Sequence, residues 1–330
     1  MTHNRRDFLV TTAAALGATF VRPLASFAKP LQARQQGQPQ GQAQGQQPQP
    51  VFTPIRRNVG TFTMRGGTVG WLVNSRGVVV VDTQFPDSAR ALLDGLQSRS
   101  RNRGVDLVIN THHHGDHTGG NGVFRGVAKR VVAHGMADQH MRRGPGAPWP
   151  PQPQQPQQNV PEPLYPDTTF THVWSAQVGD ERIVTRHHGR GHTSGDAVIT
   201  FEKANVVHMG DLMFNRRHPV VDRAAGASMR HWARILEQVA SAHARDTIYI
   251  FGHAGQGLPV TGGPAELLAF RDYLVAVLAF VEKQVAAGRT REETLAMRDA
   301  LAGFEAWGPF GQPGARDPLT VAYEEVTSGA

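Results

Sequence analysis

Hydrophobic residues after residue 50 form short β-branched runs that alternate with longer amphipathic stretches. In the first half of the chain the runs predict strands at residues 68–73, 78–82, 105–110 and 131–133. In the second half they predict strands at residues 182–187, 197–201, 205–208 and 247–251. The amphipathic stretches predict one helix at residues 87–97, directly after Pro86, and another at 229–243, where Ser228 is suited to be the N-cap.

The last part of the chain is predicted to be helical. Residues 264–287 carry an i, i+3, i+4 stripe typical of a helix that covers a core, made of Leu274, Val277, Leu278, Val281 and Val285. A second helix is expected at 291–307, because Thr290 and Glu293 have the spacing of a capping box. Several strands in each half with helices between them predict an α/β fold of two β-sheets flanked by helices.

The first 28 residues have the pattern of an export signal. Arg5 and Arg6 precede a mildly apolar stretch at residues 8–21, and Ser26 and Ala28 stand where a small-residue cleavage site would need them. This pattern resembles a twin-arginine signal peptide, which implies a periplasmic or secreted protein. The alternative is an unstructured N-terminus with a chance arginine pair. The apolar stretch is too short for stable membrane insertion.

Two segments of low complexity follow the first 28 residues, one before the predicted folded region and one within it. Residues 29–50 are rich in Gln, Pro and Gly and are expected to be a disordered linker. Residues 143–163 repeat this composition within the folded region, as a Pro/Gln-rich surface insertion in a domain at 51–330. The insertion could be inert or could cover a site.

The amino-acid composition limits the kinds of metal site and catalytic nucleophile that the protein can have. The 330 residues include 16 histidines and no cysteine, which excludes disulfides, thiolate zinc sites and cysteine nucleophiles. Any metal must be held by His and carboxylate side chains. The formal charge is +7, but no block of Lys and Arg is long enough to follow a phosphate backbone, so a nucleic-acid partner is not expected.

The histidines concentrate after the predicted strand at 105–110. His112 and His114 are two residues apart and point the same way in extended backbone, while His113 points the other way. Asp116 and His117 follow and can reach a second point nearby. Imidazole and carboxylate groups are good zinc ligands, so this loop predicts a metal site.

This His-x-His-x-Asp-His motif resembles that of the metallo-β-lactamase superfamily, and later segments resemble its further motifs in the same order. These segments are Gly191-His192, Gly210-Asp211 and Gly252-His253, and Asp82 resembles the aspartate that supports the metal loops from behind. The resemblance covers residues 51–268 and implies an αββα sandwich, with two mixed β-sheets flanked by helices.

The resemblance also implies a ligand set for two Zn²⁺ ions, with iron or manganese as alternatives. His112, His114 and His192 would hold the first ion, and Asp116, His117 and His253 the second, with Asp211 shared. The implied enzyme is a di-zinc hydrolase that uses a hydroxide shared by the ions, with Asp116 as the catalytic residue that orients the nucleophile and passes a proton.

The substrate implied is a small molecule with an ester, thioester, lactone or lactam bond. β-Lactamases of the superfamily usually lack an aspartate at the bridging position, so Asp211 is more typical of glyoxalase II, lactonases and other exported hydrolases. The alternatives are a β-lactamase, an iron enzyme that oxidises a persulfide or thiol, and a nuclease. Arg216 and Arg217 could bind an anionic group or could be ordinary surface residues. The sequence does not indicate an oligomeric state.

Overall fold

The hydrophobic residues of neighbouring strands alternate between two cores. In β4 (Val78–Val81), Val78 and Val80 pack with one buried cluster and Val79 and Val81 with another, because successive side chains of a strand point to opposite faces. Each face of the strand is therefore covered. The computed structural model describes residues 48–144 and 162–328, which belong to one compact unit, Gln47–Ala330.

Two mixed sheets form the centre. The first has the order β1-β2-β3-β4-β5-β6-β7, comprising β1 (Val51–Arg56), β2 (Val59–Thr63), β3 (Val69–Val73), β4, β5 (Leu107–Ile109), β6 (Val131–His134) and β7 (Thr168–Phe170). The second has the order β15-β13-β11-β10-β9-β8, comprising β8 (Val173–Val178), β9 (Glu181–Arg186), β10 (Val198–Phe201), β11 (Val206–His208), β13 (Ile248–Ile250) and β15 (Thr261–Gly262). A small parallel pair joins β12 (Phe214–Asn215) to β14 (His253–Ala254).

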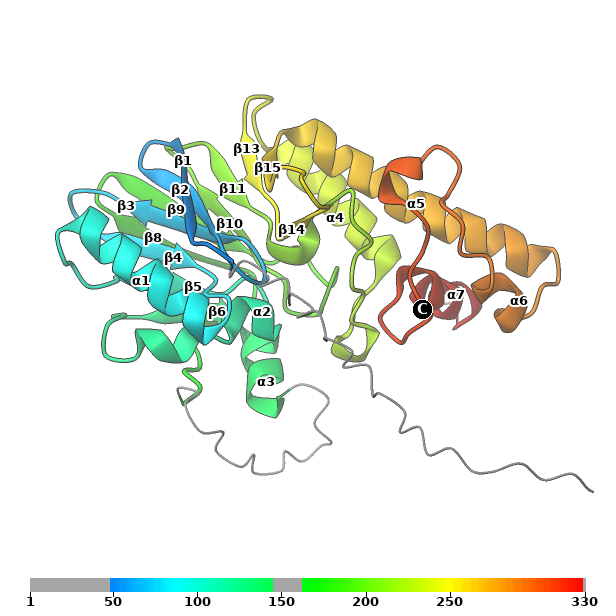
Figure 1. The fold of residues 1–330 in the computed structure, drawn as a ribbon, viewed down its shortest axis with the longest axis horizontal. Coiled ribbons are helices and arrows are strands. Elements are labelled where there is room, and N and C mark those ends of the chain that lie inside the picture. The colour runs from blue at the N-terminus through cyan, green and yellow to red at the C-terminus, as the bar shows by residue number, and fades with distance from the viewer. Residues whose placement is uncertain (1–47, 145–161, 329–330) are drawn as a thin grey trace, which may run out of the picture. The chain divides into compact units, whose positions relative to one another are not determined.

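Helices cover both outer faces (Figure 1). The helix α1 (Pro86–Ser100) packs Ala89, Leu92 and Leu96 against the first sheet. The helices α4 (Met229–Ala242) and α5 (Pro264–Ala286) cover the second sheet and enclose the largest core, and α7 (Pro318–Ser328) packs on α5. The layers run helix, sheet, sheet, helix, so the predicted αββα sandwich is confirmed.

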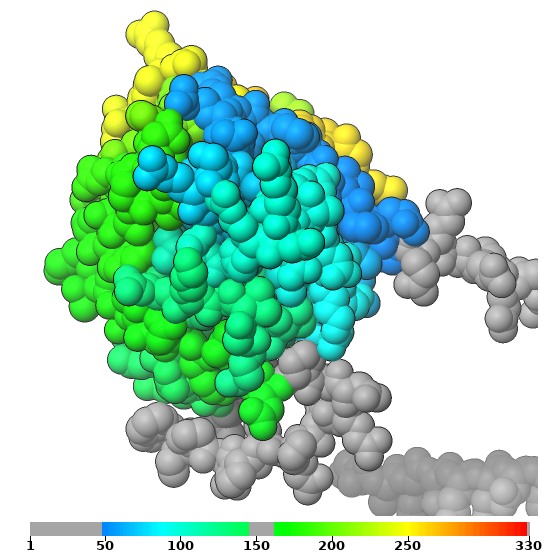
Figure 2. Space-filling model, turned by 90° about the vertical axis from the view of Figure 1, so that its left-hand side faces the viewer, coloured from blue at the N-terminus to red at the C-terminus, as the bar shows by residue number. Residues whose placement is uncertain are grey.

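Shorter helices complete the described chain. They are α2 (Gly115–Thr118), α3 (Gly135–Arg143) and α6 (Arg291–Leu295), with 3₁₀ turns at Asn121–Phe124, Gly210–Leu212, Arg223–Ala225 and Glu305–Trp307. Figure 2 shows the side of the molecule that α1 and α3 cover, where residues from the first half of the chain form much of the surface. Among the described residues, no helix has the length and apolar character needed to span a bilayer.

Capping residues and hydrophobic periodicity predict the positions of the long helices α1, α4 and α5 correctly. Ser228 caps α4 by accepting a hydrogen bond from the backbone N–H of His231, as predicted. The predicted helix at 291–307 is wrong beyond Leu295, although Thr290 and Glu293 do form the capping box. The reason is tertiary: Arg298 pairs with Asp317 at 2.6 Å, and the Arg298 carbonyl accepts from the backbone N–H of Phe310, which turns the chain away from a helical path.

The sequence did not predict β1, β2, β7, β8, α3 and α7, nor the short elements β12, β14, β15 and α2. The predicted signal peptide at 1–28 and nearly all of the linker at 29–50 and the insertion at 143–163 lie outside the described residues.

Candidate metal centre

The candidate ligands lie at one edge of the sandwich, at the carboxyl ends of strands that run in the same direction. In the first sheet β4 and β5 are parallel, and Asp82 and the His112 loop follow them. In the second sheet β11 and β13 are parallel, and Asp211 and His253 follow them. β9 runs the same way as β11, because each is antiparallel to β10, so His192 also emerges at this edge.

Four side chains form the first group. The ligand atoms of His112, His114, His192 and Asp211 all lie within 4.8 Å of one another. His192 Nε2 lies 2.9 Å from His114 Nδ1, and Asp211 Oδ2 lies 3.4 Å from His192 Nε2.

Three side chains form the second group. Asp116, His117 and His253 also lie within 4.8 Å of one another, and Asp211 reaches this group with its other oxygen. Asp211 Oδ1 lies 2.9 Å from His117 Nε2 and 3.4 Å from His253 Nε2. One carboxylate therefore presents one oxygen to each group.

Hydrogen bonds on the outer ring nitrogens of two histidines determine which ring nitrogens carry the protons. His114 Nε2 meets Asp222 at 2.8 Å, and His192 Nδ1 meets the Val220 carbonyl at 2.7 Å. A carboxylate and a carbonyl can only accept, so both ring nitrogens donate. In the neutral imidazoles the nitrogens that face each other then carry lone pairs. The two nitrogens, 2.9 Å apart, then need either a proton shared between them or a metal ion beside them.

Further atoms of the site lack partners. His112 Nε2 is buried without a hydrogen-bond partner, and His117 Nε2 and Asp211 Oδ1 are buried 2.9 Å apart but without the geometry of a hydrogen bond. Buried polar atoms are seldom left unpaired, and these converge with nitrogen and carboxylate donors of the kind that zinc prefers. The residues present therefore fit a pair of metal ions.

Sequence comparison agrees with this geometry. The profile of the Metallo-beta-lactamase superfamily matches residues 63–254, which contain all of these side chains. The chain belongs to the metallo-β-lactamase superfamily. It is an enzyme of that superfamily, with the His and Asp clusters of the superfamily's metal sites.

Individual relatives in the superfamily are distant. The chain is 23% identical over 213 residues to Metallo-beta-lactamase IND-1 of Chryseobacterium indologenes, which covers 61% of this chain and 80% of that protein. It is 23% identical over 184 residues to Metallo-beta-lactamase type 2 of Elizabethkingia meningoseptica, covering 56% of this chain and 67% of that protein. The structure of a metallo-beta-lactamase from Pontibacter korlensis aligns with a TM-score of 0.56 and 18% identity, over 69% of this chain and 99% of that one. At these identities the solved structure supports the fold alone.

Asp82 supports the second group from behind. It is fully buried and accepts from His117 Nδ1 at 2.7 Å, from the Thr111 hydroxyl at 2.7 Å and from the Thr111 N–H at 2.8 Å. Its backbone adopts φ +66°, a left-handed conformation that Asp tolerates better than most residues. Because the Thr111 hydroxyl donates to Asp82, it is left to accept from His112 Nδ1 at 3.0 Å, so Asp82 also orients His112.

Glycine is required at two positions close to the ligands, one beside each sheet. A Cβ at Gly252 would overlap with Asp211 Oδ1, and a Cβ at Gly67 would overlap with the His117 ring. Both positions let backbone pass directly against a ligand, which explains the glycine before His253 in the sequence.

The two groups differ in electrostatics. Burial lowers the pKa of His192 to about 3, with a further contribution from His114. Burial also lowers the pKa of His253, but Asp211 and Asp116 outweigh it and raise the pKa to about 9. In the second group a metal ion must therefore displace a proton that the metal-free protein holds near neutral pH.

Sequence reasoning missed Asp222 as the partner of His114, since no spacing rule connects residues 108 positions apart. His113 belongs to neither of these two groups, yet its ring is only 4.6 Å from that of His114 and its Nε2 is 3.8 Å from Asp222. Arg216 and Arg217 are exposed and make no hydrogen bond or ion pair among those of the described residues.

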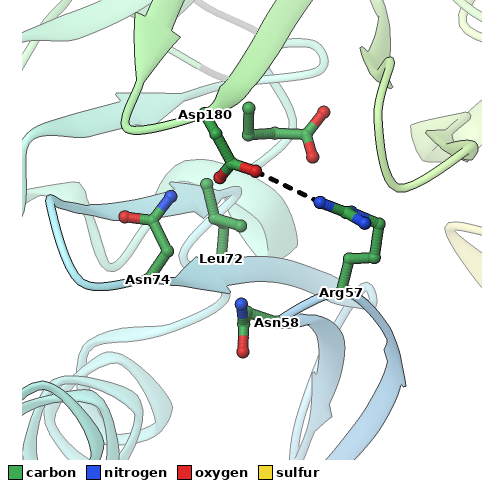
Figure 3. A pocket seen from close by; sticks show the side chains of 6 residues that line it. Arg57, Asn58, Leu72, Asn74 and Asp180 are labelled. Carbon is green, nitrogen blue, oxygen red and sulfur yellow. Dashed lines mark hydrogen bonds and ion pairs between the residues drawn. The ribbon is translucent and has the colours of Figure 1, made fainter.

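A polar pocket lies away from the metal centre, at the opposite ends of the strands (Figure 3). It has a volume of about 270 Å³ and is lined by Arg57, Asn58, Leu72, Asn74, Asp180 and Glu181. Arg57 and Asp180 form an ion pair across it at 3.1 Å. None of the candidate ligands lines this pocket.

Proposed function

We propose that the protein is a di-zinc hydrolase that cleaves a small ester, thioester, lactone or lactam. The observation that carries this proposal is the placement of Asp211, whose two oxygens face two complete groups of His and carboxylate donors. Two metal ions held there would activate water for attack and polarise the bond to be cleaved.

Asp116 is suited to accept the proton of the attacking water and to transfer it to the leaving group. Its side chain is 30% exposed, whereas those of Asp211 and His117 are 4% and 0% exposed, so Asp116 lies where the site opens to the outside. Burial raises its pKa, but the hydrogen bond from His253 and the charge of His117 outweigh burial and lower it. Asp116 is therefore an anionic base that can orient the attacking water and pass its proton to the leaving group.

The substrate class rests on the donor set. The chain has no cysteine, so a carboxylate and not a thiolate connects the two groups. The two relatives described above are metallo-β-lactamases by name, which keeps a lactam among the candidate substrates. Asp211 favours the broader family of ester, thioester and lactone hydrolases.

The test is a hydrolysis panel on zinc-loaded protein, with a chromogenic cephalosporin, lactones, thioesters and phosphodiesters. We expect turnover of one of the first three classes and its loss in His114→Ala and Asp116→Ala. His172→Ala is the matched control, because His172 is exposed and outside the site. Near-normal turnover in both site variants after chelator treatment would contradict the site.

Bound-metal analysis separates the alternatives. Iron as the bound metal, with oxygen consumed in the presence of a persulfide, would replace hydrolysis by thiol oxidation. Cleavage of RNA or DNA at low salt, with no turnover of small substrates, would indicate a nuclease.

We also propose export through the twin-arginine pattern at Arg5 and Arg6. Support comes from the sequence pattern alone. Replacement of both arginines by lysine is expected to retain the protein in the cytoplasm, as measured by cell fractionation. Unchanged export would contradict this proposal and leave the enzymatic one untouched.

A further inference from the structure

The segment from Val220 to Ser228 supports the first group of ligands. The Val220 carbonyl fixes His192 and the Asp222 carboxylate fixes His114, at 2.7 and 2.8 Å. The N–H of Asp222 also donates to the His192 carbonyl at 3.3 Å, and the N–H of Ser228 to the Gly191 carbonyl at 3.0 Å. Two of the three histidines in this group therefore take their orientation from this one segment.

The segment has little regular structure of its own. Between β12 and α4 it contains only the 3₁₀ turn Arg223–Ala225, so no sheet ladder fixes the position of Val220 or Asp222. Other residues must hold the segment in place, because Val220 and Asp222 can orient His192 and His114 only if their own positions are fixed.

The C-terminal residues supply that support. The Arg316 carbonyl accepts from the Val221 N–H at 3.0 Å, and Arg316 Nη2 lies 3.1 Å from Asp222 Oδ2. Asp222 is buried, while the Arg316 side chain is 48% exposed and reaches it from the surface. Arg316 thus holds both the backbone and the carboxylate beside His114.

The helix α7 holds the other end of the segment. Glu325 is buried and accepts from the Ser228 hydroxyl at 3.0 Å, from the Met229 N–H at 2.8 Å and from the Arg230 N–H at 3.0 Å. This carboxylate satisfies free donors at the start of α4 and complements the helix dipole. Arg223 also donates to the Ser328 hydroxyl at 3.1 Å.

In the part of the chain that the structure describes, no hydrogen bond or ion pair joins the C-terminal residues to the partners of the second group. Among the described residues His117 is fixed by Asp82, and the ring of His253 stacks on Phe214 at 5.2 Å. These residues all lie within 63–254, the region that the superfamily profile matches, whereas Arg316 and α7 lie beyond it.

We propose that residues 316–328 are a positioning element for the first metal ion, acting through Asp222 and Val220, and that they have no such role for the second. This inference rests on the proposed metal centre. It assigns a function in metal binding to a C-terminal segment that contributes no ligand.

The test measures zinc affinity of each group alone, by competition with a chromophoric chelator. His253→Ala leaves the first group intact, and His114→Ala leaves the second. In the His253→Ala protein, Asp222→Ala should weaken binding by about tenfold to hundredfold, the effect typical of a direct partner of a ligand. Arg316→Gln acts one step further away and should weaken it by about threefold to tenfold.

Controls separate positioning from general destabilisation. In the His114→Ala protein the Arg316→Gln and Asp222→Ala substitutions should leave affinity unchanged within about twofold. Glu292→Gln, on the exposed surface of α6 and outside the 316–328 element, should leave both groups unchanged. Arg316→Lys should recover part of the lost affinity. Arg316→Gln is expected to fold, because a half-exposed ion pair adds little to stability.

Three results would overturn the inference. One is unchanged first-group affinity in Arg316→Gln, whatever the effect of Asp222→Ala, and another is an equal loss in both groups. The third is a failure of both single-group proteins and of the unsubstituted protein to bind zinc, which would also overturn the proposed metal centre.

Discussion

Replacement of Asp82 by Asn tests how a buried carboxylate prepares the second group of ligands. Asn has the same shape and also tolerates the left-handed φ of +66° at this position. It can still accept from the Thr111 N–H. Its amide nitrogen, however, would face His117 Nδ1, which now donates to Asp82 at 2.7 Å. To avoid two opposed donors, His117 must move its proton to Nε2, the atom that faces Asp211 and a bound metal.

The Thr111 hydroxyl donates to the same oxygen, Oδ2, but it can rotate and accept from the new amide instead. The magnitude therefore follows from the charge-assisted hydrogen bond to His117, which is lost. Such a bond contributes about 1.5–3 kcal/mol. Since about 1.4 kcal/mol corresponds to a tenfold change in a dissociation constant, zinc affinity of the second group should fall by about tenfold to hundredfold.

The assay is the chelator competition in the His114→Ala protein, in which only the second group remains. Asp87→Asn is the matched control, because Asp87 lies in the first turn of α1, is exposed and forms an ion pair with the surface residue Arg65. Unchanged affinity in Asp82→Asn, with circular dichroism showing a folded protein, would refute the role assigned to Asp82. Loss of secondary structure would point to a role in folding instead.

Three further predictions concern stability. Burial lowers the pKa of His208 to about 4, and its neutral ring both donates to the Thr68 carbonyl and accepts from the Gly210 N–H. Because this folded pKa is below the usual 6.5, the stability that the neutral ring contributes is present above pH 6.5 and is lost as the pH falls towards 4, by about 3 kcal/mol. In urea titrations of metal-free protein, the free energy of unfolding of His208→Gln should therefore depend less steeply on pH than that of the unsubstituted protein. An identical slope would contradict the assignment. Trp232 is fully buried and donates to the Leu212 carbonyl, so Trp232→Ala should lower the free energy of unfolding by about 3–5 kcal/mol in urea, and a loss below 1 kcal/mol would argue against this packing. Zinc at about 100 times its dissociation constant should stabilise the protein by about 2.7 kcal/mol, seen as a higher melting temperature that chelator removes; a melting temperature indifferent to both would count against metal binding by the folded state.

The sequence by itself determined features that depend on neighbouring residues. The periodic stripe of α5, the Ser228 cap of α4 and the Thr290 capping box are set by side chains within a few positions of the backbone they serve. The run of His112, His114, Asp116 and His117 after an apolar strand also predicted a ligand-bearing loop, because buried strands end where polar residues begin.

The sequence also identified the ends of α5 within one residue, but it failed at the next helix. Glu293 correctly predicts where α6 begins, while its early end at Leu295 depends on Arg298 meeting Asp317, a contact made only in the folded chain. Capping is a local property, whereas the end of this helix depends on a competing tertiary contact.

The tertiary structure alone decided how the ligands are divided and held. His114 meets His192 across 78 residues and Asp222 across 108, and no local pattern encodes such distances. Parallel strands bring their carboxyl ends to one edge, and this places Asp211 with one oxygen towards each group. The support of Asp222 by Arg316 likewise arises only when the C-terminal residues pack beside the segment before α4. Residue types thus specify which atoms can bind a metal, while strand order and long-range packing specify which of these atoms meet and how they are oriented. The orientation depends on packing because the ring of a ligand histidine is held by the hydrogen-bond partner of the nitrogen that does not face the metal.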